Sequence, residues 1–124
     1  MGTPDASVIV LAAHGSRAAE ANEAHRDVAI RVAAATGQTV LPAFLELAEP
    51  GIGQAIDQAI DQGALDVVVV PYFLHPGRHL LSDIPMIVAE AGTRHPNRTI
   101  RMSEHLGASD QMVGIVVDLV NRAG

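Results

Sequence analysis

Three continuous apolar runs constrain what this chain can fold into. They read SVIVLAA at 7–13, TVLPAFLEL at 39–47 and LDVVVVPYFL at 65–74. Runs of Val, Ile and Leu without polar alternation are typical of strands that are covered on both faces, as in a parallel sheet. A fourth, weaker strand is predicted in RTIRMSE at 98–104. The chain is therefore expected to form a four-stranded parallel sheet.

Helical sequence separates these runs. In 51–63 the apolar side chains recur at spacings of three and four residues, which places them on one face of a helix. The predicted helices cover 17–36, 51–63, 84–94 and 108–122. Because strands alternate with helices, right-handed crossovers between parallel strands give a three-layer α/β sandwich.

Glycine, aspartate and proline mark the ends of the predicted helices. Gly37 and Gly63 stand where C-terminal caps are expected, because glycine adopts the left-handed backbone without strain. Asp83, two residues before Pro85, is predicted to be an N-cap. The 124 residues contain no linker or repeat, so we expect a single domain over 1–124.

Composition excludes several classes of function. A net charge of -6 and only 2% aromatic residues argue against a nucleic-acid partner. The absence of cysteine excludes disulfides and thiolate chemistry, and all eight basic residues are arginine, so no lysine can form a Schiff base. No stretch predicts a signal peptide or a transmembrane helix, so we expect a cytoplasmic protein without a membrane partner.

Polar residues follow each predicted strand, at the edge where ligands bind in parallel sheets. They are His14 to Arg17, then Glu46 and Glu49, then His75 to His79, then Glu104 and His105. The remaining two histidines fall in a helix and in a turn, at His25 and His95. Four imidazoles and several carboxylates are therefore expected to converge on one edge.

The first of these groups, His14-Gly15-Ser16-Arg17, has two interpretations. Gly15 allows a close backbone approach, and the following helix offers free N–H groups to an anion, with Ser16 as a candidate N-cap. In the alternative, His14 only bonds a backbone carbonyl in a tight turn. Position alone leaves both open.

The groups after the second and third strands also carry candidates. Pro76 and Gly77 interrupt any helix between His75 and His79, which argues against a helical metal-ligand pair. Arg78 suits a carboxylate or a phosphate. Glu46 falls in a run that otherwise reads as buried, so it needs a ligand role or an arginine partner. Glu49 is expected at an exposed helix start.

Imidazoles with a carboxylate and no thiolate suit a transient divalent-metal site. Three segments support this chemistry through a resemblance: LAAHGSR at 11–17, AFLELAEPGIGQAI at 43–56 and VVVVPYFLHPGRHLLSDIP at 67–85. Together they resemble the short, CbiX-type sirohydrochlorin chelatases, the class II chelatases. The resemblance covers nearly the whole chain.

The resemblance implies a chelatase-like, flavodoxin-like α/β fold and an ATP-independent insertion of cobalt, iron or nickel into sirohydrochlorin, within cobalamin or sirohaem biosynthesis. The metal is then a substrate, with no permanently bound cofactor, and the chain works as a homodimer. The family's two functional histidines match His14 and His79. We expect these two to hold the metal and accept protons, and Glu46 to assist. Contacts to substrate carboxylates are assigned to Ser16, Arg17, His75, Arg78 and Ser82.

Some positions depart from the family pattern. Ala13 stands where many relatives have glycine, His75 replaces an often apolar or small residue, and Glu104 and His105 inherit no role. A metal or tetrapyrrole carrier without turnover is an alternative that uses the same residues. A histidine-phosphatase-like enzyme is less favoured, because such enzymes need arginine where Ala13 stands. A flavodoxin-like nucleotide binder is disfavoured because no glycine-rich phosphate loop is present.

Overall fold

The computed structural model describes residues 7–124, apart from the side chains of His79 and Leu81. Four parallel strands form one sheet in the order β2-β1-β3-β4. Their bounds are Ser7–Ala13 for β1, Thr39–Phe44 for β2, Asp66–Pro71 for β3 and Thr99–Met102 for β4. The predicted parallel α/β sheet is confirmed: β1 has the bounds of its apolar run, and the other three strands are shorter than theirs.

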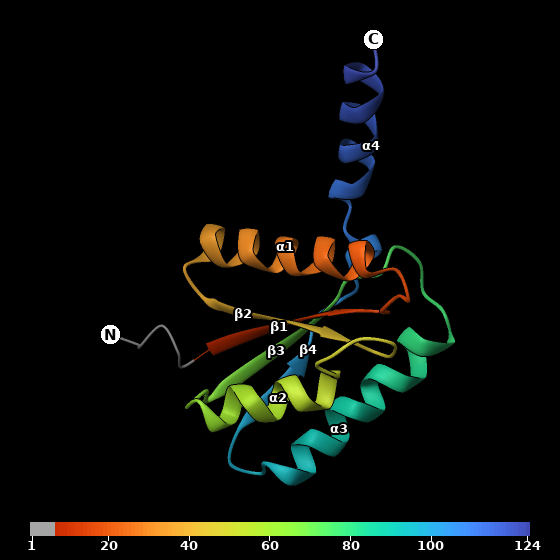
Figure 1. Cartoon of the computed structure of the whole chain (residues 1–124). Coiled ribbons are helices and arrows are strands. Elements are labelled where there is room, and N and C mark those ends of the chain that lie inside the picture. The colour runs from red at the N-terminus through yellow and green to blue at the C-terminus, as the bar shows by residue number, and fades with distance from the viewer. Residues whose placement is uncertain (1–6) are drawn as a thin grey trace.

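Helices cover the sheet unequally. Helix α1 (Ala19–Thr36) lies on one face, and α2 (Ile52–Asp61) with α3 (Ile84–Arg94) lies on the other (Figure 1). These are the three predicted layers. A last helix, α4 (Gln111–Arg122), follows the short 3-10 turn η3 (Leu106–Ala108) and projects away from the sandwich. The predicted single domain over 1–124 stays a prediction.

The core lies between the sheet and the α2–α3 layer. Val67 and Val69 of β3 alternate with outward residues, and both are fully buried in one cluster with Ile56 of α2 and Ile84 of α3. Alternation along a strand sends neighbouring side chains to opposite faces. The apolar runs therefore form strands of the sheet, and the sheet face beneath α2 and α3 is the more completely buried of the two faces.

The helix boundaries test the predicted caps. Gly37 is the left-handed C-cap of α1, with φ of 70°, and Gly63 follows the cap residue of α2 with φ of 107°. Asp83 occupies the N-cap position of α3 and Pro85 lies in the first turn, as predicted. The backbone of Asp83 is nevertheless helical and its side chain makes no capping bond, because a π-helical turn, η2 (His79–Asp83), runs directly into α3. Within residues 7–124, no helix is long and apolar enough to cross a membrane.

Candidate functional site

The site is built where β1 and β2 end. The hydrogen-bond ladder between them continues past both strands: the Leu45 N–H donates to the Ala13 carbonyl at 2.9 Å, and the Glu46 N–H donates to the His14 carbonyl at 3.0 Å. This extension keeps the segments that follow β1 and β2 side by side for two more residues. It brings His14 and Glu46 together although they are 32 positions apart in the sequence.

Gly15 makes this close approach possible. Its φ is 95°, in the left-handed region that favours glycine, and a Cβ atom there would collide with the Glu46 carbonyl oxygen. The sequence suggested that Gly15 allows the backbone to approach a ligand closely. In the structure, Gly15 allows the segment after β2 to pass close to the segment after β1.

His14 and Glu46 form an imidazole–carboxylate pair. His14 Nε2 lies 3.4 Å from Glu46 Oε2, and the two side chains are 46% and 49% exposed. On the other side of the ring, Nδ1 bonds the Gly15 carbonyl at 3.1 Å, and the Phe73 ring packs edge-on at 6.4 Å. A carbonyl oxygen only accepts, so Nδ1 carries the hydrogen in this bond. Nε2 is thereby directed toward a proton or a metal ion, with the Glu46 carboxylate beside it.

Two expectations about the acidic residues are corrected. Glu46 does not lie on a buried strand: β2 ends at Phe44, Glu46 is exposed, and its charged neighbour is His14 rather than an arginine. Glu49 is exposed as expected but does not start a helix. It precedes Pro50, whose carbonyl accepts the Phe44 N–H, and α2 begins two residues later.

Ser16 is held by a residue that the sequence did not single out. Asn22, buried in the first turn of α1, accepts the Ser16 N–H at 3.0 Å and donates to the Ser16 carbonyl at 2.8 Å. Ser16 was a candidate N-cap, and that is wrong. Ala18 occupies the cap position, and its N–H donates to the Ser16 hydroxyl at 3.0 Å. An asparagine inside an alanine-rich helix was the only signal in the sequence.

The other candidates lie at the same edge. Arg17 precedes α1 and is exposed, as are His75 and Arg78 in the segment after β3 and Ser82 in η2. The side chain of His79 lies outside the described residues, so its predicted pairing with His14 stays a prediction. Its backbone begins η2, whose next residue, Leu80, is buried in the core. A π-helical turn is uncommon and is frequent at functional sites.

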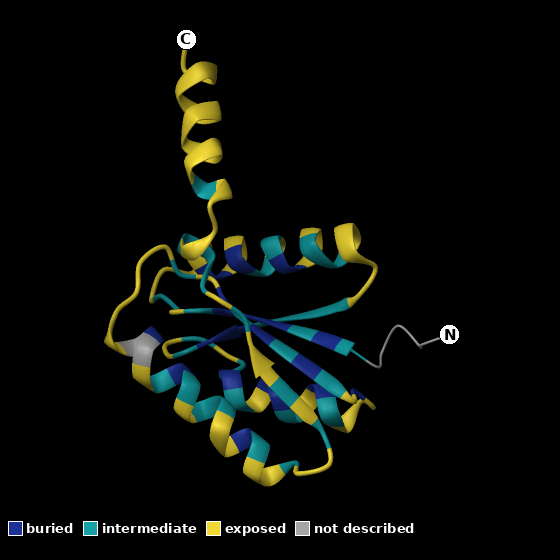
Figure 2. Ribbon diagram, turned by 180° about the vertical axis from the view of Figure 1, so that it is seen from behind, coloured by how far each residue is buried: buried dark blue, intermediate teal, exposed yellow. Residues whose placement is uncertain are grey.

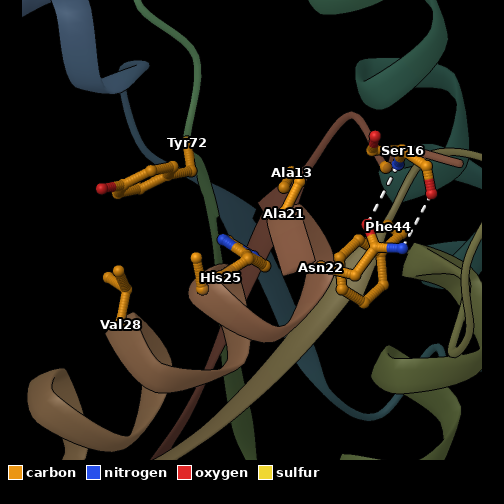
Figure 3. Close-up of a pocket in the computed structure, with 10 residues that line it drawn as sticks. Ala13, Ser16, Ala21, Asn22, His25, Val28, Phe44 and Tyr72 are labelled. Carbon is orange, nitrogen blue, oxygen red and sulfur yellow. Dashed lines mark hydrogen bonds between the residues drawn. The ribbon is translucent and has the colours of Figure 1, made fainter. Parts of the chain in front are cut away.

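A cavity of about 310 Å³ opens beside this pair, between the first half of α1 and the ends of β1, β2 and β3 (Figure 3). Its lining is mostly apolar and small. The residues are Ala13, Gly15, Ser16, Ala21, Asn22, Ala24, His25, Val28, Phe44 and Tyr72.

His25 is the buried titratable group of this cavity, and the sequence gave it no role. It is 6% exposed, its Nε2 donates to the Leu11 carbonyl at 2.9 Å, and its ring packs against Phe44 and Tyr72 at 5.4 and 5.3 Å (Figure 3). Burial lowers the pKa of His25, opposed by the Leu11 bond and helped by the charge of Arg26. The imidazole is therefore held neutral, as part of the packing of α1 on the sheet.

The described side chains contain no group of three or more histidine, aspartate or glutamate residues that could hold a metal ion together. A tight structural metal site usually needs about four ligands. The close pair at the described part of the edge is instead the His14 imidazole with the Glu46 carboxylate, both solvent-accessible, which suits an ion that arrives and leaves.

Fold and site define a class: an α/β protein with an exposed imidazole–carboxylate pair at the carboxyl edge of a parallel sheet. The CbiX family model matches residues 8–123, and the chain belongs to the CbiX family. It is 36% identical over 120 residues to the chloroplastic sirohydrochlorin ferrochelatase of Arabidopsis thaliana. The aligned region covers 96% of this chain and 53% of that protein. The chain spans about half the length, or less, of the first curated relatives it matches.

Two solved structures share the fold. A cobalamin (vitamin B12) biosynthesis CbiX protein from Marinobacter aquaeolei VT8 superposes with a TM-score of 0.84 at 32% identity, over 94% of this chain and 96% of that one. The sirohydrochlorin chelatase SirB from Bacillus subtilis subspecies spizizenii, in complex with cobalt, superposes with a TM-score of 0.79 at 27% identity, over 94% of this chain and 50% of that one.

Proposed function

We propose that this protein inserts a divalent metal ion into sirohydrochlorin, without ATP. The observation that carries the proposal is the His14–Glu46 pair at the carboxyl edge of the sheet of a CbiX-family chain. Relatives named sirohydrochlorin ferrochelatase and sirohydrochlorin cobaltochelatase support this substrate and this reaction.

The chemistry follows from the exposed nitrogen of His14. The pyrrole N–H protons of the ring must leave as the metal enters, so a base must be within reach of them. Nε2 of His14 can bind the incoming ion or take a proton, and the Glu46 carboxylate at 3.4 Å stabilises the positive charge that either event brings. The pair is weak enough as a ligand set to release the metal to the macrocycle.

The other edge residues complete the proposal. His79 shares the metal and the protons with His14. The guanidinium groups of Arg17 and Arg78 hold peripheral carboxylates of the ring, because a planar fork matches a carboxylate in two hydrogen bonds. Ser82, His75 and the Ser16 loop add polar contacts, the Ser16 hydroxyl already accepting the Ala18 N–H.

Cobalt is the metal we propose first, followed by iron, with nickel third. Relatives named for cobalt and for iron support the first two, and the solved SirB structures contain cobalt and Fe3+. Affinity order alone does not select between metals in a cell, because availability also decides.

Replacing His14 or His79 with alanine tests the proposal. The rate of metal insertion is measured from the absorbance change of sirohydrochlorin, with cobalt, iron and nickel in parallel. In either variant this rate should fall about 10²-fold or more, because that is the usual contribution of a positioned acid–base group. Glu46→Gln should lower the rate as well, whereas Glu49→Gln, an exposed carboxylate of the same segment, should not. Parent-level insertion in both histidine variants, after subtraction of the spontaneous reaction, would show that the assignment is wrong.

A carrier without turnover is the second candidate, because it would use the same side chains. Product formed in excess over protein supports the enzyme, and release of no more than one metallated ring per chain supports the carrier. The relatives named as chelatases favour the enzyme.

We further propose that the chain works as a homodimer in the cytoplasm. Light scattering on the purified protein tests the dimer, and fractionation of the source cells tests the compartment.

A further inference from the structure

Two exposed leucines lie beside the candidate site. Leu47 follows Glu46 in the loop after β2 and is 54% exposed, and Leu74 follows Phe73 in the connection after β3 and is 55% exposed. Every residue of that connection from Leu74 to Arg78 is exposed (Figure 2). Single leucines on a protein surface are ordinary, so exposure alone assigns a role to neither of them.

The backbone of Leu47 distinguishes it from the other exposed leucines. Its φ is 66°, and among the residues that the structure describes it is the one non-glycine residue with a positive φ. Glycine and asparagine adopt this left-handed conformation readily, whereas a leucine there is strained by its Cβ atom. Backbone strain of this kind is found mainly at functional sites, where the surrounding structure maintains it. Leu47 directly follows Glu46, the carboxylate that lies beside His14.

The loop that carries Leu47 is held on both sides of that residue. The Glu46 N–H, directly before Leu47, donates to the His14 carbonyl at 3.0 Å. The Arg26 guanidinium donates to the Glu49 carbonyl, two residues after Leu47, at 3.2 Å. The backbone of Leu47 is therefore fixed relative to His14, and a ligand that contacts its side chain has little loop order to impose on binding.

The backbone of Leu74 is fixed by the turn η3. The Gly107 N–H donates to the Phe73 carbonyl at 2.9 Å, and a Cβ atom at Gly107 would collide with the Leu74 carbonyl oxygen. The Phe73 ring in turn packs edge-on against the His14 ring, with 6.4 Å between the ring centroids. Leu74 is therefore held next to a residue that contacts the imidazole of the candidate site.

The strand order places the two leucines on opposite sides of His14. Strand β1 lies between β2 and β3 in the sheet, so the residues after β1 lie between the loop of Leu47 and the connection of Leu74. Neighbouring strands are about 4.8 Å apart, which puts the two flanking segments about 10 Å from each other. A flat macrocycle that lies across this edge can contact both leucines while its centre lies at the imidazole.

We propose that Leu47 and Leu74 bind the apolar face of the tetrapyrrole, one on each side of the His14 imidazole. The inference rests on the proposed function and assigns two further substrate-binding residues to it. Arg17 and Arg78 hold carboxylates at the rim of the ring, but charges at the rim leave the conjugated face in water. The leucines displace that water and keep the ring nitrogens at the imidazole. A polar residue at position 47 would relieve the strain and lose this contact.

Replacement of each leucine by asparagine tests the contacts, with the affinity for metal-free sirohydrochlorin as the readout. In a titration followed by the absorbance of the ring, Leu47→Asn and Leu74→Asn should each bind about 10-fold more weakly, the order of effect of one lost leucine contact. Leu47→Met and Leu74→Met keep an apolar side chain of similar volume and should bind as the parent does. The matched control is Leu65→Asn, at a leucine that is 57% exposed before β3, at the opposite edge of the sheet, and it should also bind as the parent does.

Stability separates a substrate contact from a structural role. Leu47→Asn should unfold at the urea concentration of the parent or at a higher one, because asparagine tolerates the left-handed backbone. Its KM for sirohydrochlorin should rise about 10-fold while kcat changes by less than about threefold, as expected when binding to ground state and transition state is lost equally. Leu47→Gly, which relieves the strain and has no side chain, should lose the same affinity. A lower unfolding midpoint in Leu47→Asn, with the affinity of the parent, would overturn the inference.

Failure of this inference and failure of the proposed function give different results. A parent chain that neither binds sirohydrochlorin nor inserts metal refutes the proposed function and the leucine contacts with it. A parent chain that does both, with asparagine and glycine variants that bind the ring as tightly, refutes only the leucine contacts. The His14→Ala variant should lose insertion and keep most of its affinity for the metal-free ring, which is the reverse of the result expected for Leu47→Asn.

Discussion

The two faces of the sheet differ in how completely they are covered. Beneath α2 and α3 the side chains are apolar and closely packed, and Val69, Ile56 and Ile84 are fully buried. Beneath α1 the contact includes two buried polar residues, Asn22 and His25, and a cavity of about 310 Å³. The closed face contributes most of the stability through burial of apolar surface. The open face carries this cavity and adjoins the candidate site.

The largest difference between the faces should appear on truncation of an isoleucine. Ile56 of α2 is fully buried, so Ile56→Ala should lower the free energy of unfolding by about 2–5 kcal/mol, through lost transfer energy and the cavity left behind. Ile30 of α1 is 67% exposed, so Ile30→Ala should change the free energy of unfolding by less than about 0.5 kcal/mol. Urea unfolding measures both. Equal losses would mean that the α1 face is as tightly packed as the other.

A smaller effect is expected at the junction between the open face and the site. Gly15→Ala should cost about 1–3 kcal/mol, because its left-handed backbone and its contact with the Glu46 carbonyl oxygen leave no room for a methyl group. Metal insertion should fall with it, since Glu46 would be displaced from His14. Gly77→Ala is the matched control: it faces open space and should leave stability and insertion unchanged.

His25 should make the open face sensitive to acid. Burial lowers its pKa in the folded state, so the unfolded chain binds the proton more readily. Its contribution is complete above about pH 6.5, the pKa of an unperturbed histidine, and is lost as the pH falls below that value. His25→Gln should cost about 0.5–1.5 kcal/mol at pH 7 and should reduce the loss of stability between pH 7 and pH 5.

The matched control is Val28→Ala, at the same cavity but without a titratable group, which should leave the pH dependence of unfolding as in the parent. An unaltered slope in the His25 variant, measured by urea unfolding at each pH, would contradict the assignment of the acid sensitivity to His25.

The smallest effects concern one ion pair on each face. On the closed side, Asp57 of α2 accepts hydrogen bonds from His95 at 2.7 Å and Arg94 at 3.0 Å. On the open side, Asp66 accepts from Arg101 at 3.0 Å. Burial by itself would raise the pKa of Asp57, but the hydrogen bonds from His95 and Arg94 outweigh burial, so the pKa of Asp57 is lowered. The Arg101 bond lowers the pKa of Asp66.

Asp57→Asn and Asp66→Asn should each cost about 0.2–1 kcal/mol at neutral pH, as exposed pairs do. Both folded-state pKa values lie below the unfolded one, so the contribution is present above about pH 4 and is lost as the pH falls further. Salt of about 1 M should weaken both.

Local sequence predicted much of the fold. The run 65–74 contains β3, the helix predicted over 84–94 has the bounds of α3, and Gly37 caps α1 with a left-handed backbone. These features depend on hydrophobic periodicity and on the conformational freedom of single residues, which neighbours along the chain determine. The candidate residues after the strands also lie at one edge of the sheet, as predicted, because parallel strands bring their carboxyl ends together.

The site was predicted only in part. His14 lies at the edge of the sheet where it was expected. Glu46 was expected on a buried strand with a ligand role or an arginine partner, and it lies beyond β2, exposed and beside His14. Which carboxylate meets His14 depends on the register of β1 with β2 and on Gly15, which allows the two segments after these strands to approach. Register is a property of the assembled sheet, and no single segment contains it.

The sequence by itself determined the strands, most helix bounds, the parallel order of elements and the edge that carries the candidate residues. Only the tertiary structure decided three things: that His14 faces Glu46, that His25 and Asn22 are buried under α1, and that α4 leaves the sandwich. The physical reason is that periodicity reports how apolar a face is, whereas packing decides what covers it. Helix α4 has the sequence of a buried helix, and the fold leaves it exposed.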